Sequence, residues 1–264
     1  MRSASEYYDT VAEDYHNFYD GDLLDPSQPY PANWFRLQLL KKSFKDCKAV
    51  LDVGCGDGFP LSELPAPTKH AFDISPRMVE EARKRLPSVM VADITRPETY
   101  HFDTLFDGLI CTGVMPHIED ERQALENMKA LLSPGGKIFV EFRNELFNLF
   151  TFNRLTVDFV ADRLTLPKYR KQVRGALSAR LKMDAPKLRP YDQMLAKYHN
   201  PFEIMELFED LGFVDANLLW YHYHPSLPWL GFERQDAMAM EDKPSWKSMF
   251  ICSAFVVEAR RIGG

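Results

Sequence analysis

The chain has 264 residues, of which 45% are hydrophobic and 13% aromatic, so it can bury a sizeable core and is not expected to be disordered. Its formal net charge of −6 argues against a protein that coats nucleic acid. No run approaches the roughly 20 apolar residues of a transmembrane helix, and the polar, acidic start lacks the apolar segment of a secretory signal, so the sequence favours a cytoplasmic protein without membrane contact.

The N-terminal part is expected to be helical up to the first strand. Tyr8 and Tyr15 are spaced for one face of a helix within residues 3–20. Residues 33–44 have the pattern of a second, amphipathic helix. The apolar, β-branched run Val50–Val53 is expected to form the first strand, which leads directly into a glycine-rich loop.

Beyond this loop, short apolar strands alternate with helical patterns. Further strands are expected at residues 69–73, 89–92, 106–112 and 137–142, and the sequence SPGG at 133–136 is expected to be a turn. Ser75 and Asp120 are placed to begin the intervening helices. This alternation predicts a parallel sheet with helices on both faces.

After residue 142 the alternation stops and then resumes. Residues 144–199 contain no convincing buried strand and have the pattern of helical pieces. Asn200 and Pro201 then begin a helix that Gly212 ends. The last two strands are expected at 214–221 and 249–258.

The stretch VLDVGCGDGFP, residues 50–60, is the first chemically informative motif. A Walker loop requires Gly-Lys-Ser/Thr, which is absent, and a dinucleotide fingerprint requires a glycine where Phe59 stands. Asp52, close to the turn, would repel a pyrophosphate and better accommodates a ligand that carries an ammonium or a sulfonium. The glycines allow positive φ angles and a close approach of backbone to ligand.

VLDVGCGDG resembles the first motif of class I S-adenosylmethionine-dependent methyltransferases. The resemblance continues in order through AFDIS, VADIT, FDGLICTGVMPHIED and LLSPGGKIFVEF, so it covers roughly residues 7–142 and the final two strands. It implies an α/β, Rossmann-like, doubly wound sheet of seven mostly parallel strands. The last strand would be antiparallel, and a helical insertion would follow strand five. It also implies S-adenosyl-L-methionine as the cofactor.

The resemblance suggests three parts of the chain. Residues 1–143 would hold the N-terminal helices and the cofactor-binding part, 144–199 a helical substrate cover, and 200–264 the last two strands. Residues 168–189 contain eight basic residues and one acid. This segment is either a solvated helix face or a basic rim that attracts an acidic small molecule.

The family motifs also imply a set of cofactor-binding residues. Asp73 would accept hydrogen bonds from both ribose hydroxyls, Asp93 would bind the adenine amino group, and Ile74 and Met78 would sandwich the adenine ring. Asp73 or Asp93 could alternatively cap the next helix, and the tyrosines could be ordinary packing residues. The expected set is Tyr8, Tyr15, Asp52, Gly54, Cys55, Gly56, Asp73, Ile74, Met78, Asp93, Ile94, Cys111 and Thr112.

Candidate catalytic and substrate residues follow the strand ends. His117 matches a family histidine that is either a general base or a brace for its loop. Arg143 and Asn144 end strand five and are expected, with His222 and His224, to face the substrate. A metal site is not expected, because no third ligand accompanies the two histidines and the four cysteines have no paired spacing.

The sequence therefore predicts methyl transfer by in-line displacement to a small, acidic metabolite or sugar-type acceptor, with oxygen favoured as the acceptor atom. An N-methyltransferase, an aminopropyl transferase on the same fold, or a non-catalytic cofactor-binding regulator remain as alternatives. The expected partner is a small molecule and not a nucleic acid. The oligomeric state is not encoded in any motif.

Overall fold

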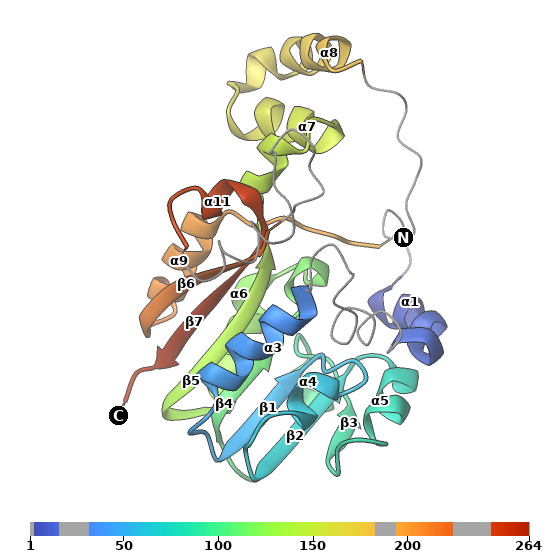
Figure 1. Ribbon diagram of the computed structural model, residues 1–264, viewed down its shortest axis with the longest axis vertical. Coiled ribbons are helices and arrows are strands. Elements are labelled where there is room, and N and C mark those ends of the chain that lie inside the picture. Colours follow the sequence, from blue (N-terminus) through green and yellow to red (C-terminus); the bar gives the residue numbers. More distant parts are fainter. Residues whose placement is uncertain (1–2, 16–31, 183–193, 224–243, 264) are drawn as a thin grey trace.

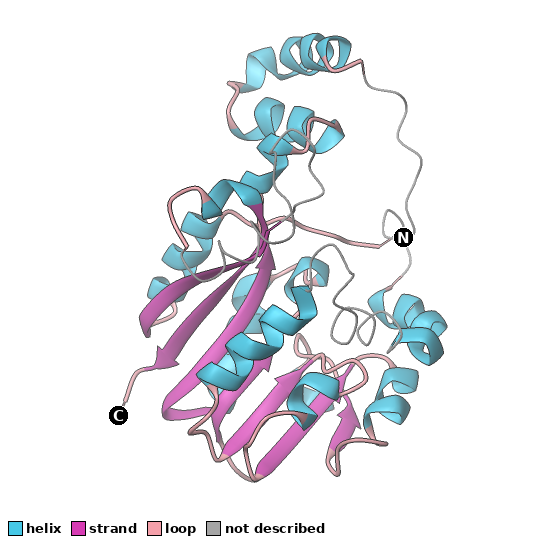
Figure 2. Cartoon of the chain, in the orientation of Figure 1, coloured by secondary structure: helices cyan, strands magenta, loops and turns pink. Residues whose placement is uncertain are grey.

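The computed structural model describes residues 3–15, 32–182, 194–223 and 244–263. Its centre is a seven-stranded sheet of order β3-β2-β1-β4-β5-β7-β6 (Figures 1 and 2). The strands are β1 (Ala49–Val53), β2 (Thr68–Asp73), β3 (Val89–Val91), β4 (Phe106–Cys111), β5 (Leu132–Arg143), β6 (Phe213–Tyr223) and β7 (Cys252–Arg261). Strands β1 to β5 are parallel, and β7 lies antiparallel between β5 and β6. The predicted fold class is confirmed.

Helices cover both faces of this sheet (Figure 1). Side chains of α3, α4 and α5 share one core cluster with the sheet, and side chains of α6 and α9 share the cluster on the other face. The helices, including short 3-10 turns (η), are α1 (Ala4–Val11), η1 (Ala12–Asp14), α3 (Ala32–Ser43), α4 (Phe59–Ser62), α5 (Pro76–Ala82), η2 (Pro97–Thr99), η3 (Met115–His117), α6 (Glu121–Leu131), η4 (Leu146–Phe150), α7 (Arg154–Arg163), η5 (Pro167–Tyr169), α8 (Arg170–Arg180), α9 (Pro201–Asp210) and α11 (Ser248–Ile251).

The expected helix starts are present. The side chains of Ser75, Asp120 and Asn200 each accept a hydrogen bond from a backbone amide in the first turn of the helix that follows. These bonds satisfy amides that have no partner within the helix. The short polar residues therefore fix where α5, α6 and α9 begin, as the sequence predicted.

The SPGG segment is not a separate turn, which corrects the sequence-based prediction. Residue Phe106 of β4 pairs with Leu132 and Gly108 pairs with Lys137, so residues 133–136 form an irregularity inside β5. Gly135 has a φ of 75°, which glycine adopts without strain. The segment therefore bulges while the strand continues.

The last strand begins three residues later than predicted, at Cys252, because residues 249–251 belong to the helical turn α11. Asn144 at the end of β5 holds this turn, since its side-chain amide donates to the carbonyls of Met249 (2.6 Å) and Cys252 (2.8 Å). A contact between residues more than 100 positions apart leaves no local signal in the sequence.

The helices α7 and α8 lie beyond the carboxyl end of β5 (Figure 1). No residue of α8 is buried. Arg174 of α8 forms ion pairs with Asp158 and Asp162 of α7, which neutralises part of the basic stretch predicted at 168–189. Among the helices that the structure describes, none has the length and apolar character needed to cross a membrane.

Candidate functional site

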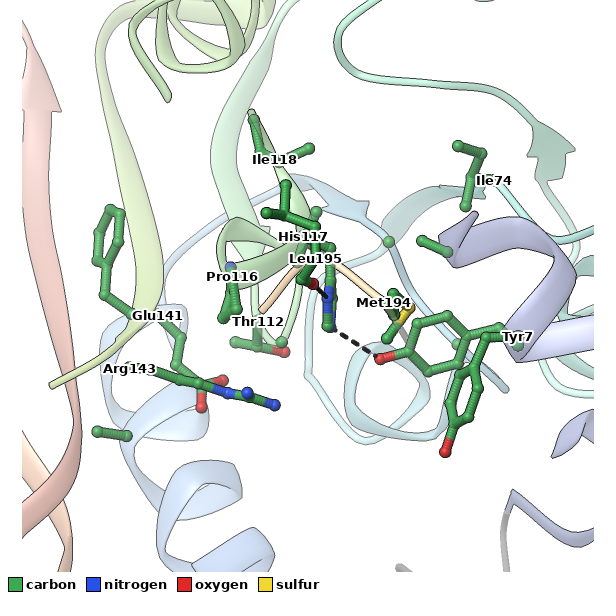
Figure 3. Close-up of a pocket in the computed structure, with 18 of the residues that line it drawn as sticks. Tyr7, Ile74, Thr112, Pro116, His117, Ile118, Glu141, Arg143, Met194 and Leu195 are labelled. Carbon is green, nitrogen blue, oxygen red and sulfur yellow. Dashed lines mark hydrogen bonds between the residues drawn. The ribbon is translucent and has the colours of Figure 1, made fainter. Parts of the chain in front are cut away.

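A cavity of about 1290 Å³ opens at the carboxyl edge of the sheet. Strands β2 and β4 lie on either side of β1 in the sheet. The connections that follow β1 and β4 therefore run to opposite sides, toward β2 and toward β5. Ligands of open α/β sheets bind in the crevice at such a switch point. The wall is formed by the loops after β1, β2, β3 and β4, the end of β5, and parts of α1, η4 and residues 194–198 (Figure 3).

The glycine loop after β1 presents its backbone to this cavity. Gly54 has a φ of 72° and Gly56 a φ of 55°, so both adopt the left-handed conformation. A Cβ at position 54 would lie 2.2 Å from Cγ2 of Val114, and one at position 56 would lie 3.0 Å from Cε1 of Tyr15. The loop is therefore packed closely on both sides, and both glycines line the cavity.

Asp73, at the end of β2, ties this loop to the neighbouring strand. Its carboxylate accepts hydrogen bonds from the backbone amides of Gly56 and Ser75, each at 2.9 Å. Burial raises its pKa to about 6, although the backbone hydrogen bonds act in the opposite direction. Asp73 also lines the cavity, so one side chain both braces the loop and contributes to the wall.

Asp52 lies beneath the wall and is almost completely buried. Its Oδ1 atom has no hydrogen-bond partner within the described part of the chain. Burial and then the negative charge of Asp73 raise the pKa of Asp52 to about 7, while the nearby Arg36 lowers it. Two buried carboxyl groups therefore make this end of the cavity favourable for a cation.

We expect the free energy of unfolding of the Asp52→Asn variant to depend less on pH than that of the wild type. The pKa of Asp52 is raised from 3.8 to about 7 by folding, so its stabilising contribution is complete below pH 3.8 and disappears as the pH rises through about 7. The difference in the free energy of unfolding between wild type and variant should change by up to about 1.4 kcal/mol per pH unit within this range. Urea unfolding from pH 5 to 8 measures it, and Asp103→Asn, at an exposed position, is the control. Parallel curves for wild type and Asp52→Asn would contradict the assignment.

The loop after β3 contributes Asp93 and Ile94 to the wall. The carboxylate of Asp93 accepts hydrogen bonds from the backbone amide (2.9 Å) and the hydroxyl (2.7 Å) of Thr95. Ile74 lines the cavity and is partly exposed, whereas Met78 is buried and lies off the wall. Met78 is one of the three buried residues of α5, together with Val79 and Ala82. The structure therefore does not place Ile74 and Met78 on opposite sides of a slot, as a sandwich would require.

Three other predicted residues also lie behind the wall. Cys55 and Cys111 are buried, and burial raises the pKa of both thiols well above the ordinary value, so neither is a reactive thiolate. Thr112, next along the chain, does line the cavity. Asn144 is fully buried, and its amide holds α11 and the start of β7.

The helix α1 closes one side of the cavity. Asp9 accepts hydrogen bonds from the hydroxyl of Ser75 and, at 3.3 Å, from the amide of Arg77, which fixes α1 on the start of α5. Tyr8 and Tyr15 both line the cavity, and their rings meet edge to face with centroids 6.1 Å apart. Tyr15 follows the turn η1 and lies against Gly56, whereas Tyr8 of α1 contacts His117, so the single helix predicted for both tyrosines ends before Tyr15.

His117 lies on the opposite wall, in the turn η3 after β4 (Figure 3). Its Nδ1 is 2.6 Å from the carbonyl oxygen of Leu195, and its Nε2 is 3.3 Å from the hydroxyl of Tyr8. A carbonyl only accepts, so Nδ1 carries the proton and the Tyr8 hydroxyl donates to Nε2. Burial lowers the pKa of His117 below 6.5, so the ring is neutral at neutral pH with its lone pair on Nε2.

A buried polar network at the end of β5 was not predicted as a unit. Glu141 lies 3.2 Å from Nη1 of Arg36 and accepts a hydrogen bond from the hydroxyl of Tyr221. Glu141 and Arg143 are two residues apart on the strand, so they share one face of it and both line the cavity. Figure 3 shows the guanidinium of Arg143 pointing into the cavity below His117. Polar residues at alternate positions in an apolar strand were the available sequence signal.

Of the two histidines predicted to face the substrate, one lies in β6 and the other is outside the described residues. His222 lines the cavity, while His224 lies outside the described residues. Within the described ranges, no group of three or more His, Cys, Asp or Glu residues could hold a metal ion.

Comparison with known proteins finds similarity to methyltransferases. Residues 51–138 match a family described as methyltransferase domain. An uncharacterised methyltransferase of Mycobacterium bovis is 33% identical over 114 residues, which cover 39% of this chain and 57% of that protein. The chain thus spans little more than half the length of this relative. A ubiquinone biosynthesis O-methyltransferase of Coxiella burnetii is 26% identical over 187 residues, covering 67% of this chain and 68% of that protein.

Solved structures share the fold at low sequence identity. A methyltransferase of Thermotoga maritima, described as a possible histamine N-methyltransferase, has a TM-score of 0.58 at 15% identity and covers 97% of this chain and 99% of its own. The N-methyltransferase NodS of Bradyrhizobium japonicum, solved with S-adenosyl-L-homocysteine, has a TM-score of 0.55 at 15% identity and covers 97% of this chain and 98% of its own.

Proposed function

We propose that this chain, whose residues 51–138 match a methyltransferase-domain family, is a class I, S-adenosylmethionine-dependent enzyme that transfers a methyl group to a small anionic molecule. The observation that carries the proposal is one continuous cavity. It joins a glycine loop backed by buried carboxyl groups to a neutral histidine whose Nε2 lone pair is turned toward Tyr8 in the cavity. The first half suits a cationic donor, and the second half suits an acceptor that must lose a proton.

The residues present fit S-adenosylmethionine as the donor. Gly54 and Gly56 would present their backbone to the methionine part, and the buried carboxyl of Asp52, whose Oδ1 has no hydrogen-bond partner among the described residues, favours a positive charge nearby. Asp73 would accept the ribose hydroxyls, and Asp93 with Ile94 would hold the adenine. When bound, this cofactor supplies an electrophilic methyl group on a sulfonium.

The chain's own contribution is alignment and exclusion of water. Tyr8 and Tyr15 would close over the donor, and Thr112 would lie beside the reacting atoms. His117 would take the proton of an acceptor hydroxyl at Nε2, after the hydroxyl displaces Tyr8 from that nitrogen. Methyl transfer to oxygen is therefore our preferred reaction.

Arg143 supports an anionic acceptor, because its guanidinium enters the cavity on the side of His117 (Figure 3). A carboxylate or phosphate bound there would form a paired, charge-assisted hydrogen bond. Glu141, on the same face of β5, forms an ion pair with Arg36 and accepts from Tyr221, so Arg36 offsets its negative charge.

Calorimetry with S-adenosylmethionine tests the donor, and labelled methyl transfer to a metabolite extract separated by charge tests the acceptor. We expect binding of the donor and label in the anionic fraction. Arg143→Gln should reduce kcat/KM for that acceptor by about 10-fold to 100-fold, because a charged hydrogen bond contributes about 1.5–3 kcal/mol. Its affinity for the donor should be unchanged. No donor binding would refute the proposal, and label only in neutral or cationic fractions would refute its acceptor class.

A further inference from the structure

The segment Met194–His199, here called the strap, crosses from the helical region after β5 back to the site. Met194, Leu195 and Tyr198 of the strap line the cavity. The carbonyl oxygen of Leu195 accepts the hydrogen bond from Nδ1 of His117 at 2.6 Å. The strap is therefore in direct contact with the side chain that we propose as the base.

Backbone hydrogen bonds fix the strap to two walls of the cavity. The amide of Lys197 donates to the carbonyl of Pro116 (2.8 Å), directly before His117. The amide of His199 donates to the carbonyl of Arg143 (2.8 Å), and the carbonyl of His199 accepts from the amide of Glu145 (2.9 Å). The strap thus connects the turn that holds His117 with the strand end that holds Arg143.

One carboxylate anchors two side chains of the strap. Oε1 of Glu121, in the first turn of α6, lies 2.8 Å from Nζ of Lys197 and 3.2 Å from Nε2 of His199. Burial lowers the pKa of His199 to about 4, so the neutral ring donates from Nε2 to Glu121. Nζ of Lys197 also donates to the carbonyl of Glu119, at 2.5 Å.

We propose that the strap is a positioning element that holds His117 in the tautomer with the proton on Nδ1, so that the lone pair of Nε2 faces the cavity. This inference rests on the proposed role of His117. The hydrogen bond made by one ring nitrogen decides which nitrogen of a neutral imidazole carries the proton. Without the carbonyl of Leu195, Nε2 can carry the proton and then cannot accept one from a substrate.

The other groups around His117 act on the ring elsewhere, and the strap supplies the hydrogen-bond partner of Nδ1. Tyr8 from α1 reaches the other nitrogen, Nε2. Arg143 from β5 carries the nearby positive charge and lowers the pKa of the ring, while the bond to Leu195 raises it. Glu121, Lys197 and His199 act at the anchors of the strap and make no hydrogen bond to His117 in the described part of the chain.

Nitrogen-15 NMR of the histidine side chains in the full chain tests this inference without knowing the acceptor. The spectrum of His117→Gln assigns the resonances of His117. In wild type at pH 7.5, we expect His117 to be neutral with the proton on Nδ1. A proton on Nε2 in wild type would overturn the inference.

Two variants test whether the strap causes this state. Glu121→Ala removes the acceptor shared by Lys197 and His199, and Lys197→Met removes one of the two side-chain anchors. In both we expect some of the Nε2-protonated tautomer and a His117 pKa lower by about 0.5–1 unit, because a hydrogen bond that favours the charged ring is weakened. The effect should be larger in Glu121→Ala. Glu126→Ala, on the exposed face of the same helix, is the matched control and should match wild type.

Circular dichroism and thermal unfolding establish that each variant is folded. If Glu121→Ala does not fold, Lys197→Met alone decides the question. Folded variants with the wild-type tautomer and pKa would refute the inference, even if the chain proves to be a methyltransferase. Conversely, full turnover in His117→Gln would refute the proposal that His117 is the general base. The conclusion from NMR that the strap fixes the tautomer of His117 would still hold.

Discussion

Replacing Asp73 with alanine is expected to weaken binding of S-adenosylmethionine by about 100-fold or more. The carboxylate accepts the amides of Gly56 and Ser75, so its loss frees the glycine loop and leaves two donors without partners. It also removes the proposed acceptor of the ribose hydroxyls. Hydrogen bonds to a charged group contribute about 1.5–3 kcal/mol each, and about 2.7 kcal/mol corresponds to 100-fold in affinity.

Calorimetry of wild type and Asp73→Ala with S-adenosylmethionine and S-adenosylhomocysteine measures this loss. Asp73→Asn retains the shape of the side chain and can still accept one hydrogen bond, so we expect an intermediate affinity. Asp103→Ala, at an exposed position, is the control. An Asp73→Ala dissociation constant within about 3-fold of wild type would show that the donor does not lie against this carboxylate.

Replacing His117 with glutamine is expected to reduce turnover by about 100-fold to 10,000-fold if the acceptor atom is a hydroxyl oxygen, which is the range for loss of a general base. Affinity for the donor should change much less than turnover, because the hydrogen bonds of His117 in the described residues go to Tyr8 and Leu195 and none goes to the glycine loop. Single-turnover kinetics with saturating donor separates the two quantities. Unchanged turnover would assign His117 to bracing its loop and would favour a nitrogen acceptor, which needs no base.

The pH dependence gives an independent check on the same residue. The base must be neutral, so kcat/KM should fall as the pH drops through the pKa of His117, which burial holds below 6.5. In His117→Gln this acid limb should be absent. An acid limb of the same midpoint in the variant would assign the titration to another group.

The fold could be predicted because each strand has a recognisable local sequence pattern. Short apolar runs such as Val50–Val53 are bounded by loops, and short polar residues such as Ser75 mark helix starts by capping them. The errors arose where tertiary contacts override local patterns. The SPGG bulge is held inside β5 by pairing with β4, and α11 is held by the side chain of Asn144.

Many of the residues proposed for donor binding line the cavity, as their positions after strand ends in motifs of fixed spacing suggest, and their role stays a prediction. Direction of side chains was less predictable: Met78 has the right position in the sequence but packs into the core. The contacts of Glu141 with Arg36 and Tyr221, and of His117 with Leu195, join residues about 80–105 positions apart. No local pattern reports such pairs, so the sequence placed His117 and Arg143 near the site, whereas their contacts came only from the structure.

The cavity wall is divided between two stretches of chain, and this division has an evolutionary consequence. The proposed donor contacts come from the first four strands and α1, whereas η4 and the strap, from the region after β5, supply much of the remaining wall. Changes in length or composition after β5 can therefore alter which molecule is modified, while the machinery for the donor stays intact. Related proteins can therefore acquire different acceptors through sequence changes in this one region.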